Sequence, residues 1–179
     1  MQVLFLQKRA SKAGAQVCLA ALVRALRSQG VEAQVLLGEQ GWLAEELRAQ
    51  NALAGIVPFP SWRSPVAKWL RLPAFALFTH RLAKSSSRPQ LLHANDLWEA
   101  LVTEWLARRW QRPWILHLRT VATSQQLAKY HASRANAVLV VSPSLGLDLP
   151  SERCHYLPDG LAASEFYPLV QNRSDFPKR

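Results

Sequence analysis

Glycine, basic and hydrogen-bonding residues gather at five places in this sequence, each directly after a short apolar stretch. These groups occupy residues 8–14, 93–96, 119–123, 142–144 and 159–160. Lysine, arginine and glycine beside a helix start favour the binding of a phosphate or another anion. Histidine, asparagine and aspartate can orient hydroxyl groups. The sequence therefore indicates a ligand that carries negative charge, hydroxyl groups or both.

The first of these groups predicts an anion site. Lys8, Arg9 and Lys12 precede Gly14, and residues 15–26 have the apolar spacing of an amphipathic helix. Glycine leaves the backbone open to a phosphate or substrate at the helix N-terminus, where basic side chains strengthen the positive potential. The alternative is a tight turn that needs glycine, within an ordinary solvated basic loop. A second short helix is expected to begin near Ser142, which makes another candidate anion site.

Arg119 ends a strand that should otherwise be buried, where an arginine is rarely placed without a partner. Its side chain either pairs with Asp96 or Glu99, or forms a planar fork that holds a phosphate or carboxylate. His93 and His117 are candidates for catalysis, with packing in the core or at strand ends as the alternative. Asp96 with Glu99 resembles a helix-capping box, so Asp96 is first a helix cap and second a partner for hydroxyl groups.

Short β-rich apolar runs alternate with helical periodicity along the chain, which is the order of βαβ units. The runs predict strands at residues 3–6, 33–37, 55–59, 90–93, 114–118, 137–141 and 155–157. Further helices are expected at residues 42–51 and 97–110, and Gly30 stands where a C-terminal helix cap belongs. The pattern predicts an α/β fold with one doubly wound, mainly parallel sheet of about seven strands. Ligands of such sheets bind beyond the carboxyl ends of the strands.

Length and composition limit the number of domains and indicate the cellular compartment and the charge of a partner. The 179 residues are 49% hydrophobic, which suits one buried core rather than two ordinary domains. The formal net charge of +10 predicts attraction to an anionic partner. Cys18 and Cys154 have no CxxC spacing, so we expect no disulfide framework and a cytoplasmic setting. We find no secretory signal and no apolar run of spanning length, so any membrane contact would be peripheral, on the inner face of the cell membrane.

The segment at residues 62–88 mixes aromatic and basic side chains. Trp62, Lys68, Trp69 and Arg71 are the candidates for contact with the headgroup layer of an anionic membrane. The alternative is that the aromatic side chains pack on the sheet while the charges form its solvated face. Pro73 is expected to break or kink this segment into two short helices.

Taken in order, the strand-end motifs resemble the N-terminal domain of family-four retaining glycosyltransferases, which have the two-domain GT-B fold. Residues 13–16, Ala-Gly-Ala-Gln, are similar to the family's Gly-Gly-Ala-Glu, and residues 91–96 resemble its strand that ends in His-x-His. Residues 113–119 resemble the family's proline-led fifth strand, and residues 137–142 its Ala-Asp-Ala-Val-x-x-Val-Ser segment. Residues 156–161, Tyr-Leu-Pro-Asp-Gly-Leu, resemble its Ile-Pro-Asn-Gly-Val-Asp stretch.

The sequence departs from this family pattern at four positions. Asn95 replaces the second histidine of His-x-His, Asp159 replaces the asparagine of Asn-Gly, and Ala162 replaces the usual aspartate. Arg119 stands where the fifth strand usually leads to a histidine that lines the reaction centre. The family's catalytic detail therefore does not transfer directly to this chain.

The resemblance implies transfer of a sugar, with retention, from a nucleotide sugar to a phosphorylated or lipid-linked acceptor such as a cell-envelope glycolipid. It implies a Rossmann-like acceptor domain at residues 1–168 and a polar tail or linker at residues 169–179, while the C-terminal donor-binding domain is absent. Alone, the chain is expected to be inactive or nearly so, because donor and acceptor must be brought together by both halves. We expect no cofactor and no metal besides the nucleotide sugar as co-substrate.

The same resemblance implies roles for single residues. Arg119 and His93 are the candidate catalytic residues, with Arg119 stabilising negative charge on the leaving diphosphate. Asp159 and Gly160 also make a turn in the simplest interpretation. Acceptor or phosphate binding is expected from Gly14, Lys8, Arg9, Lys12, Asn95, Asp96, Ser142, Asp159 and Gly160.

Besides this reaction, the sequence leaves one other function open and argues against two more. A noncatalytic subunit that binds the acceptor or tethers a two-chain transferase to the membrane stays open. A nucleotide-linked oxidoreductase is disfavoured because residues 8–16 contain one glycine instead of G-x-G-x-x-G. Nucleic-acid binding is disfavoured because the positive charge is spread over loops and helices without a recognisable nucleic-acid-reading motif.

Overall fold

The computed structural model describes residues 1–60, 65–84, 89–146, 148–149 and 151–160. Within them, seven parallel strands form one sheet in the order β3-β2-β1-β4-β5-β6-β7. The strands are β1 (Gln2–Gln7), β2 (Glu32–Leu37), β3 (Leu53–Ile56), β4 (Leu91–Ala94), β5 (Trp114–Leu118), β6 (Ala137–Val140) and β7 (Cys154–Tyr156). The predicted doubly wound α/β fold is confirmed. The strand order reverses between β1 and β4, so the loops that leave these two strands diverge and open a crevice at their carboxyl ends.

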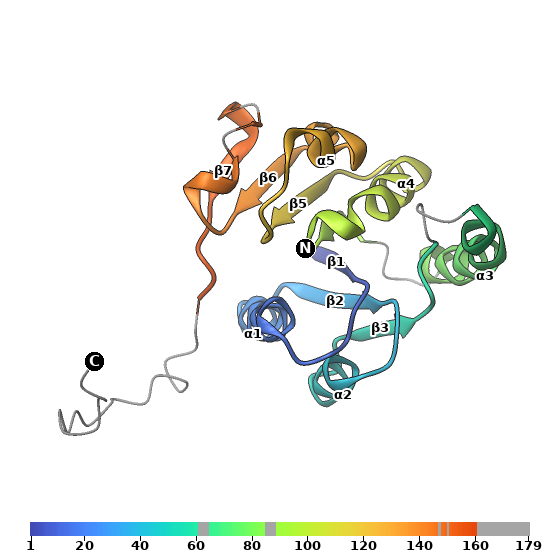
Figure 1. Cartoon of the computed structure of the whole chain (residues 1–179). Coiled ribbons are helices and arrows are strands. Elements are labelled where there is room, and N and C mark those ends of the chain that lie inside the picture. The colour runs from blue at the N-terminus through green and yellow to red at the C-terminus, as the bar shows by residue number, and fades with distance from the viewer. Residues whose placement is uncertain (61–64, 85–88, 147, 150, 161–179) are drawn as a thin grey trace, which may run out of the picture.

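Helices cover both faces of the sheet, as Figure 1 shows. On one face, α1 (Gly14–Ser28) and α2 (Trp42–Ala49) enclose a core centred on β1 and β2. On the other face, α3 (Pro65–Lys84), α4 (Ala100–Trp110) and α5 (Ser124–Lys129) enclose a second core. Short 3-10 helices follow the strands or precede them: η1 (Leu97–Glu99), η2 (Ala132–Arg134), η3 (Pro143–Gly146) and η4 (Ser151–Arg153). None of the described helices is long and apolar enough to cross a bilayer.

The predicted amphipathic helix after β1 is confirmed as α1. Leu19 and Val23 are fully buried against β1 and β2, and Leu22 and Leu26 pack beside them. Gly30 has a φ of 77°, and the Val31 N–H donates to the Leu26 carbonyl at 3.0 Å. This left-handed glycine ends the helix as predicted.

The third strand begins and ends earlier than predicted. β3 covers Leu53–Ile56 instead of residues 55–59. The Val57 N–H still donates to the Leu37 carbonyl at 2.9 Å, but Pro58 has no N–H with which to continue the ladder. The chain then turns Phe59 into the core, which is why its apolar side chain resembled a strand position.

The prediction of two short helices separated at Pro73 was wrong, because α3 is continuous from Pro65 to Lys84. Pro73 is exposed, while Phe75 and Thr79 are fully buried on the opposite side of the helix. Packing of that buried side outweighs the loss of one backbone hydrogen bond at the proline. Trp62, predicted to contact a membrane, and the predicted tail at residues 169–179 lie outside the described residues.

Candidate functional site

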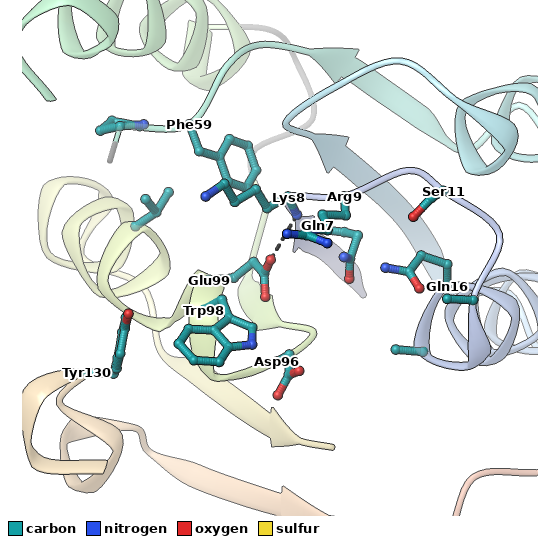
Figure 2. Close-up of a pocket in the computed structure, with 14 residues that line it drawn as sticks. Gln7, Lys8, Arg9, Ser11, Gln16, Phe59, Asp96, Trp98, Glu99 and Tyr130 are labelled. Carbon is teal, nitrogen blue, oxygen red and sulfur yellow. Dashed lines mark hydrogen bonds between the residues drawn. The ribbon is translucent and has the colours of Figure 1, made fainter. Parts of the chain in front are cut away.

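A cavity of about 480 Å³, here named the first cavity, lies at the carboxyl ends of β1 and β4 (Figure 2). Its walls come from the loop after β1, the first turn of α1, the segment after β3, and η1 with the start of α4. The polar residues that line it are Gln7, Lys8, Arg9, Ser11, Gln16, Asp96 and Glu99. The first cavity therefore occupies the crevice that the strand order predicts.

Contacts from two directions hold the loop after β1 at the rim of this cavity. The Lys8 N–H donates to Glu99 Oε1 at 2.9 Å. The Ala10 N–H donates to Glu39 Oε1 at 3.1 Å, in the loop after β2. A Cβ atom at Gly38 would lie 2.6 Å from the Lys8 carbonyl oxygen, so the two loops can approach this closely only with glycine at position 38.

Glu99 is a buried ionisable group in the wall of the first cavity. Its exposed fraction is 2%, and its Oε2 atom has no hydrogen-bond partner among the described residues. Burial raises the pKa of Glu99 to about 8; the charge of Asp96 raises it too, whereas the hydrogen bond from the Lys8 N–H lowers it. The carboxyl group is therefore mostly protonated at pH 7. Because Oε1 accepts from Lys8, the proton belongs on Oε2.

Asp96 caps η1 as predicted, since its Oδ1 accepts from the Leu97 N–H at 2.8 Å. The second half of the predicted capping box is wrong, because Glu99 bonds the loop after β1 instead of the Asp96 N–H. Asp96 also accepts from the Thr120 hydroxyl and, at 3.4 Å, from the Arg119 N–H. The carboxylate thus ties the end of β4 to the end of β5.

Three amide side chains lie where β1, β4 and α1 meet. The Asn95 Nδ2 atom donates to Gln7 Oε1 at 2.6 Å and to the Ala15 carbonyl at 3.4 Å. Within the part of the chain that the structure describes, Gln16 Oε1 and Asn95 Oδ1 are buried without a hydrogen-bond partner. Gln16 lines the first cavity, whereas Asn95 is fully buried and does not. Gln16 therefore brings a side chain with a buried, unpaired acceptor oxygen into the wall of the first cavity.

Aromatic side chains form the opposite side of the first cavity. Figure 2 shows Trp98, Tyr130 and Phe59 facing the loop after β1 and the start of α1. The rings of Trp98 and Tyr130 are nearly perpendicular, with centroids 5.3 Å apart. Trp98 keeps part of its surface exposed, whereas Tyr130 is buried. The cavity therefore pairs a polar wall with an apolar, aromatic wall, as is typical of small-molecule sites.

A second cavity of about 330 Å³ lies between α1 and the segment after β7. Arg119 and Asp159 form an ion pair in its wall, and the Arg119 side chain is only 5% exposed. The two structural partners predicted for this side chain are therefore wrong; only the Arg119 backbone contacts Asp96, and Glu99 bonds Lys8. A phosphate that binds the guanidinium in this arrangement would compete with the Asp159 carboxylate.

His93 and His117 are neighbours in the sheet, with ring centroids 5.6 Å apart, and both are buried. The His117 Nδ1 atom lies 3.1 Å from Arg119 Nη2. Burial lowers the pKa of both histidines, and the charge of Arg119 lowers it further, to about 4 for His117. Both rings are therefore neutral at pH 7. His93 lines neither cavity, so its catalytic role stays a prediction.

The structure brings some of the predicted binding residues together and separates others. Lys8, Arg9 and Asp96 line the first cavity, and Asp159 and Gly160 line the second with Arg119. Their roles in binding stay predictions. No group of three or more histidine, cysteine, aspartate or glutamate side chains suited to a metal ion occurs in the described part of the chain.

Lys12, Gly14 and Ser142 line neither cavity. The Lys12 Nζ atom lies 5.5 Å from the centroid of the Trp42 ring, which is a cation–π distance. Gly14 has no positive φ, and an added Cβ would meet nothing within 4 Å, so the tight-turn explanation of this glycine does not hold. Ser142 directly precedes η3, and its hydroxyl lies 3.0 Å from that of Ser144.

Sequence reasoning missed several residues of the first cavity. Gln7 is the last residue of β1, one position before the polar group that was singled out. Gln16 is a polar side chain on the buried face of α1, which is a signal in the sequence once the helix face is known. Glu99, Trp98 and Tyr130 carry no local signal of this kind, because their positions depend on how η1 and α5 pack against β1 and β4.

The chain belongs to the glycosyl transferase 4-like domain family, whose sequence profile matches residues 13–160. The matched range includes Gln16, Glu99, Arg119 and Asp159, and therefore parts of both cavities. No curated protein matches the sequence.

Solved GT-B glycosyltransferases have the same fold over slightly less than half of their length. HepE from Anabaena, in complex with UDP, has a TM-score of 0.69 and 18% identity, covering 90% of this chain and 44% of HepE. MurG from Acinetobacter baumannii has a TM-score of 0.64 and 16% identity over 90% of this chain and 47% of MurG. The lipopolysaccharide outer core galactosyltransferase WaaB, in its apo form, has a TM-score of 0.60 and 10% identity, covering 86% and 44%. The predicted N-terminal GT-B domain is confirmed, and the chain spans less than half of each of these proteins.

Proposed function

We propose that this chain is the acceptor-binding half of a retaining, nucleotide-sugar-dependent glycosyltransferase that acts in the synthesis of a cell-envelope polysaccharide or glycolipid. The first cavity receives the acceptor, and a second domain holds most of the donor. The similarity to HepE, solved with UDP-glucose, and to the lipopolysaccharide galactosyltransferase WaaB supports this choice of reaction. Retention of stereochemistry follows the resemblance to family-four enzymes.

The observation that carries this proposal is the pair of buried oxygen atoms in the cavity wall, Gln16 Oε1 and Glu99 Oε2, which lack partners among the described residues. A buried polar atom without a hydrogen bond costs about 1–3 kcal/mol. Gln16 Oε1 can only accept, whereas the protonated Oε2 of Glu99 can donate and accept. Hydroxyl groups of a bound ligand would satisfy both atoms once the two side chains turn toward the cavity, and a sugar presents several hydroxyl groups on one rigid ring.

The other walls of the first cavity fit the same ligand. A sugar ring has an apolar face of C–H groups, and the partly exposed ring of Trp98 offers it a flat surface. Lys8 and Arg9 are exposed at the rim, where their charges attract a phosphate of the acceptor or of the donor. The open space in front of Gly14 leaves the N-terminus of α1 accessible to such a group.

Saturation-transfer NMR on the 179-residue chain tests this function. The probes are the methyl glycosides of glucose, galactose and N-acetylglucosamine, with NAD⁺ as the competing ligand class. We expect signal from at least one glycoside and none from NAD⁺. Incubation of the chain alone with UDP-glucose and the same glycosides should give no transfer, because both halves are needed. Saturation of NAD⁺ without any glycoside, or turnover by the chain alone, contradicts the proposal.

A further inference from the structure

The outer face of α3 exposes four large apolar side chains. Trp69 and Leu70 are 69% and 75% exposed, and Val66 and Leu77 are also more than half exposed. The spacing of positions 66, 69, 70 and 77 places them on one side of a helix, together with the exposed Pro73. We name these five residues the α3 outer face. Contiguous apolar surface of this kind marks an interaction site in a soluble protein.

The inner face of the same helix is packed, so the outer face is exposed although α3 is docked on the sheet. Phe75 and Thr79 are fully buried, and the rings of Phe75 and Phe59 lie 5.5 Å apart. Phe78 lies over Gly55 of β3, where an added Cβ would come within 2.2 Å of the ring. An amphipathic helix normally directs one apolar face inward, whereas α3 has apolar residues on both sides.

Along the sequence, α3 and its flanking segments carry charges of a single sign. Residues 47–95 contain no aspartate or glutamate. The basic residues of this stretch are Arg48, Arg63, Lys68, Arg71, Arg81, Lys84 and Arg88. Arg71 and Arg81 are exposed on α3 itself. Arg71 and Arg81 therefore attract an anionic surface, and α3 itself carries no carboxylate that would repel it.

We propose that the α3 outer face docks on an anionic lipid bilayer, with α3 parallel to the surface. The apolar side chains enter the headgroup boundary, a tryptophan among them, and the flanking arginines contact lipid phosphates. A protein partner explains the apolar stripe equally well, but the absence of carboxylates over 49 residues fits the uniform negative charge of a membrane surface. This docking site is separate from the first cavity and does not rest on its function.

The position of α3 also connects the docking surface to the candidate site. Phe59 lines the first cavity and packs on Phe75 of α3, so one layer of side chains separates the helix from the cavity. A bilayer that contacts the α3 outer face lies near the side of the cavity formed by the segment after β3. A lipid-linked ligand would then enter the cavity from the membrane side.

Co-sedimentation of the 179-residue chain with vesicles tests the proposal. Vesicles of phosphatidylcholine with 30% phosphatidylglycerol are compared with phosphatidylcholine alone. We expect at least tenfold stronger partitioning to the anionic vesicles, and a loss of several-fold when salt is raised from 0.1 to 0.5 M. Trp69→Ala combined with Leu70→Ala should lower partitioning at least tenfold, and Arg71→Glu combined with Arg81→Glu should remove the preference for anionic lipid.

Val121→Ala is the matched control, because Val121 is an exposed apolar residue outside α3 and its loss should leave partitioning unchanged. Circular dichroism and thermal unfolding confirm that each variant is folded. Absence of binding to the anionic vesicles overturns the proposal, as does equal partitioning of the Trp69 and Leu70 variant and the wild type. Sedimentation equilibrium on the lipid-free chain adds a third result: a dimer that the same double variant dissociates assigns the α3 outer face to a second copy and overturns membrane docking.

Discussion

The two cavities at the carboxyl edge of the sheet differ in that an ion pair lines the wall of the second. In the first cavity, Gln16 and Glu99 keep buried atoms without hydrogen bonds among the described residues. In the second cavity, Arg119 Nε and His117 Nε2 also lack partners among the described residues, but the charge of the Arg119 guanidinium is already paired with Asp159. Both sets of residues follow strands or open helices at the same edge. Neither position at a strand end nor an unsatisfied buried atom is therefore enough by itself to identify a ligand-binding group; the wall of the first cavity combines the two without an internal ion pair.

The second cavity also relates two departures from the family pattern. Arg119 replaces a histidine and Asp159 replaces an asparagine, and the two side chains contact each other. The resemblance implies neutral residues at these two positions, whereas this chain has an ion pair there, so that neither charge is buried alone. We interpret Arg119 as a structural residue in this arrangement, and its role toward a diphosphate stays a prediction.

The largest expected change in stability comes from the protonated carboxyl group of Glu99 in the first cavity. The folded chain holds the Glu99 proton up to about pH 8, whereas the ordinary pKa is 4.5. The folded state binds more protons between these values, so the free energy of unfolding falls as pH rises through this range. Glu99→Gln keeps an acceptor for Lys8 and removes the titration, and should be roughly 3 kcal/mol more stable than the wild type at pH 8 and nearly equal at pH 5.

Urea unfolding at pH 5, 6, 7 and 8 measures how the free energy of unfolding of the wild type and of Glu99→Gln depends on pH. Glu45→Gln serves as the control, because Glu45 is exposed in α2 and should follow the wild type at every pH. If Glu99→Gln and the wild type lose stability in parallel between pH 5 and 8, Glu99 is not protonated in the folded state.

Removal of one partner of the Arg119–Asp159 ion pair in the second cavity should lower the stability of the protein. Asp159→Ala leaves the Arg119 guanidinium nearly buried without its counter-charge. We expect a loss of about 2 kcal/mol, less than for a fully buried pair because Asp159 is partly exposed. Asp148→Ala, which removes an exposed carboxylate bonded to Ser124, should cost less than about 0.5 kcal/mol. Denaturant unfolding measures both losses. Equal losses of stability for the two variants would show that the ion pair does not stabilise the fold.

Gly38 and Gly14 differ in whether an added side chain would meet neighbouring atoms. Gly38→Ala forces a Cβ against the Lys8 backbone and should lower stability by about 1–2 kcal/mol. Gly14→Ala meets open space at the start of α1, so its stability should stay within about 0.5 kcal/mol of the wild type. Thermal unfolding compares the two variants directly. A Gly14→Ala variant as unstable as Gly38→Ala would return Gly14 to a role in the turn.

The fold was largely predictable because its signals are local. Apolar runs, the amphipathic stripe of α1 and the glycine cap at Gly30 each depend on neighbouring residues, and all are confirmed. The errors arise where tertiary packing overrides a local rule. Pro73 stays inside α3 because the other side of the helix is anchored, and β3 is shifted because Pro58 ends its ladder.

The candidate site was predictable in position but not in its members. Lys8, Arg9 and Asp96, which the strand-end rule singled out, line the first cavity, while their binding roles stay predictions. Glu99 was interpreted as a capping partner, because its bond to the Lys8 N–H joins residues 91 positions apart. The partner of Arg119 was missed for the same reason, since Asp159 lies 40 residues further along the chain. Contacts between distant segments leave no trace in local spacing.

The most direct test compares the two cavities through one ligand. The dissociation constant of the methyl glycoside with the strongest saturation-transfer signal is measured by NMR titration for the wild type, Gln16→Leu and Asp159→Asn. Gln29→Leu, the same substitution at an exposed end of α1, is the control for Gln16→Leu. We predict about five- to tenfold weaker binding for Gln16→Leu, since a lost hydrogen bond is worth about 1–1.5 kcal/mol, and an unchanged constant for Asp159→Asn. Weaker binding by Asp159→Asn with Gln16→Leu unchanged would contradict the assignment of the acceptor to the first cavity.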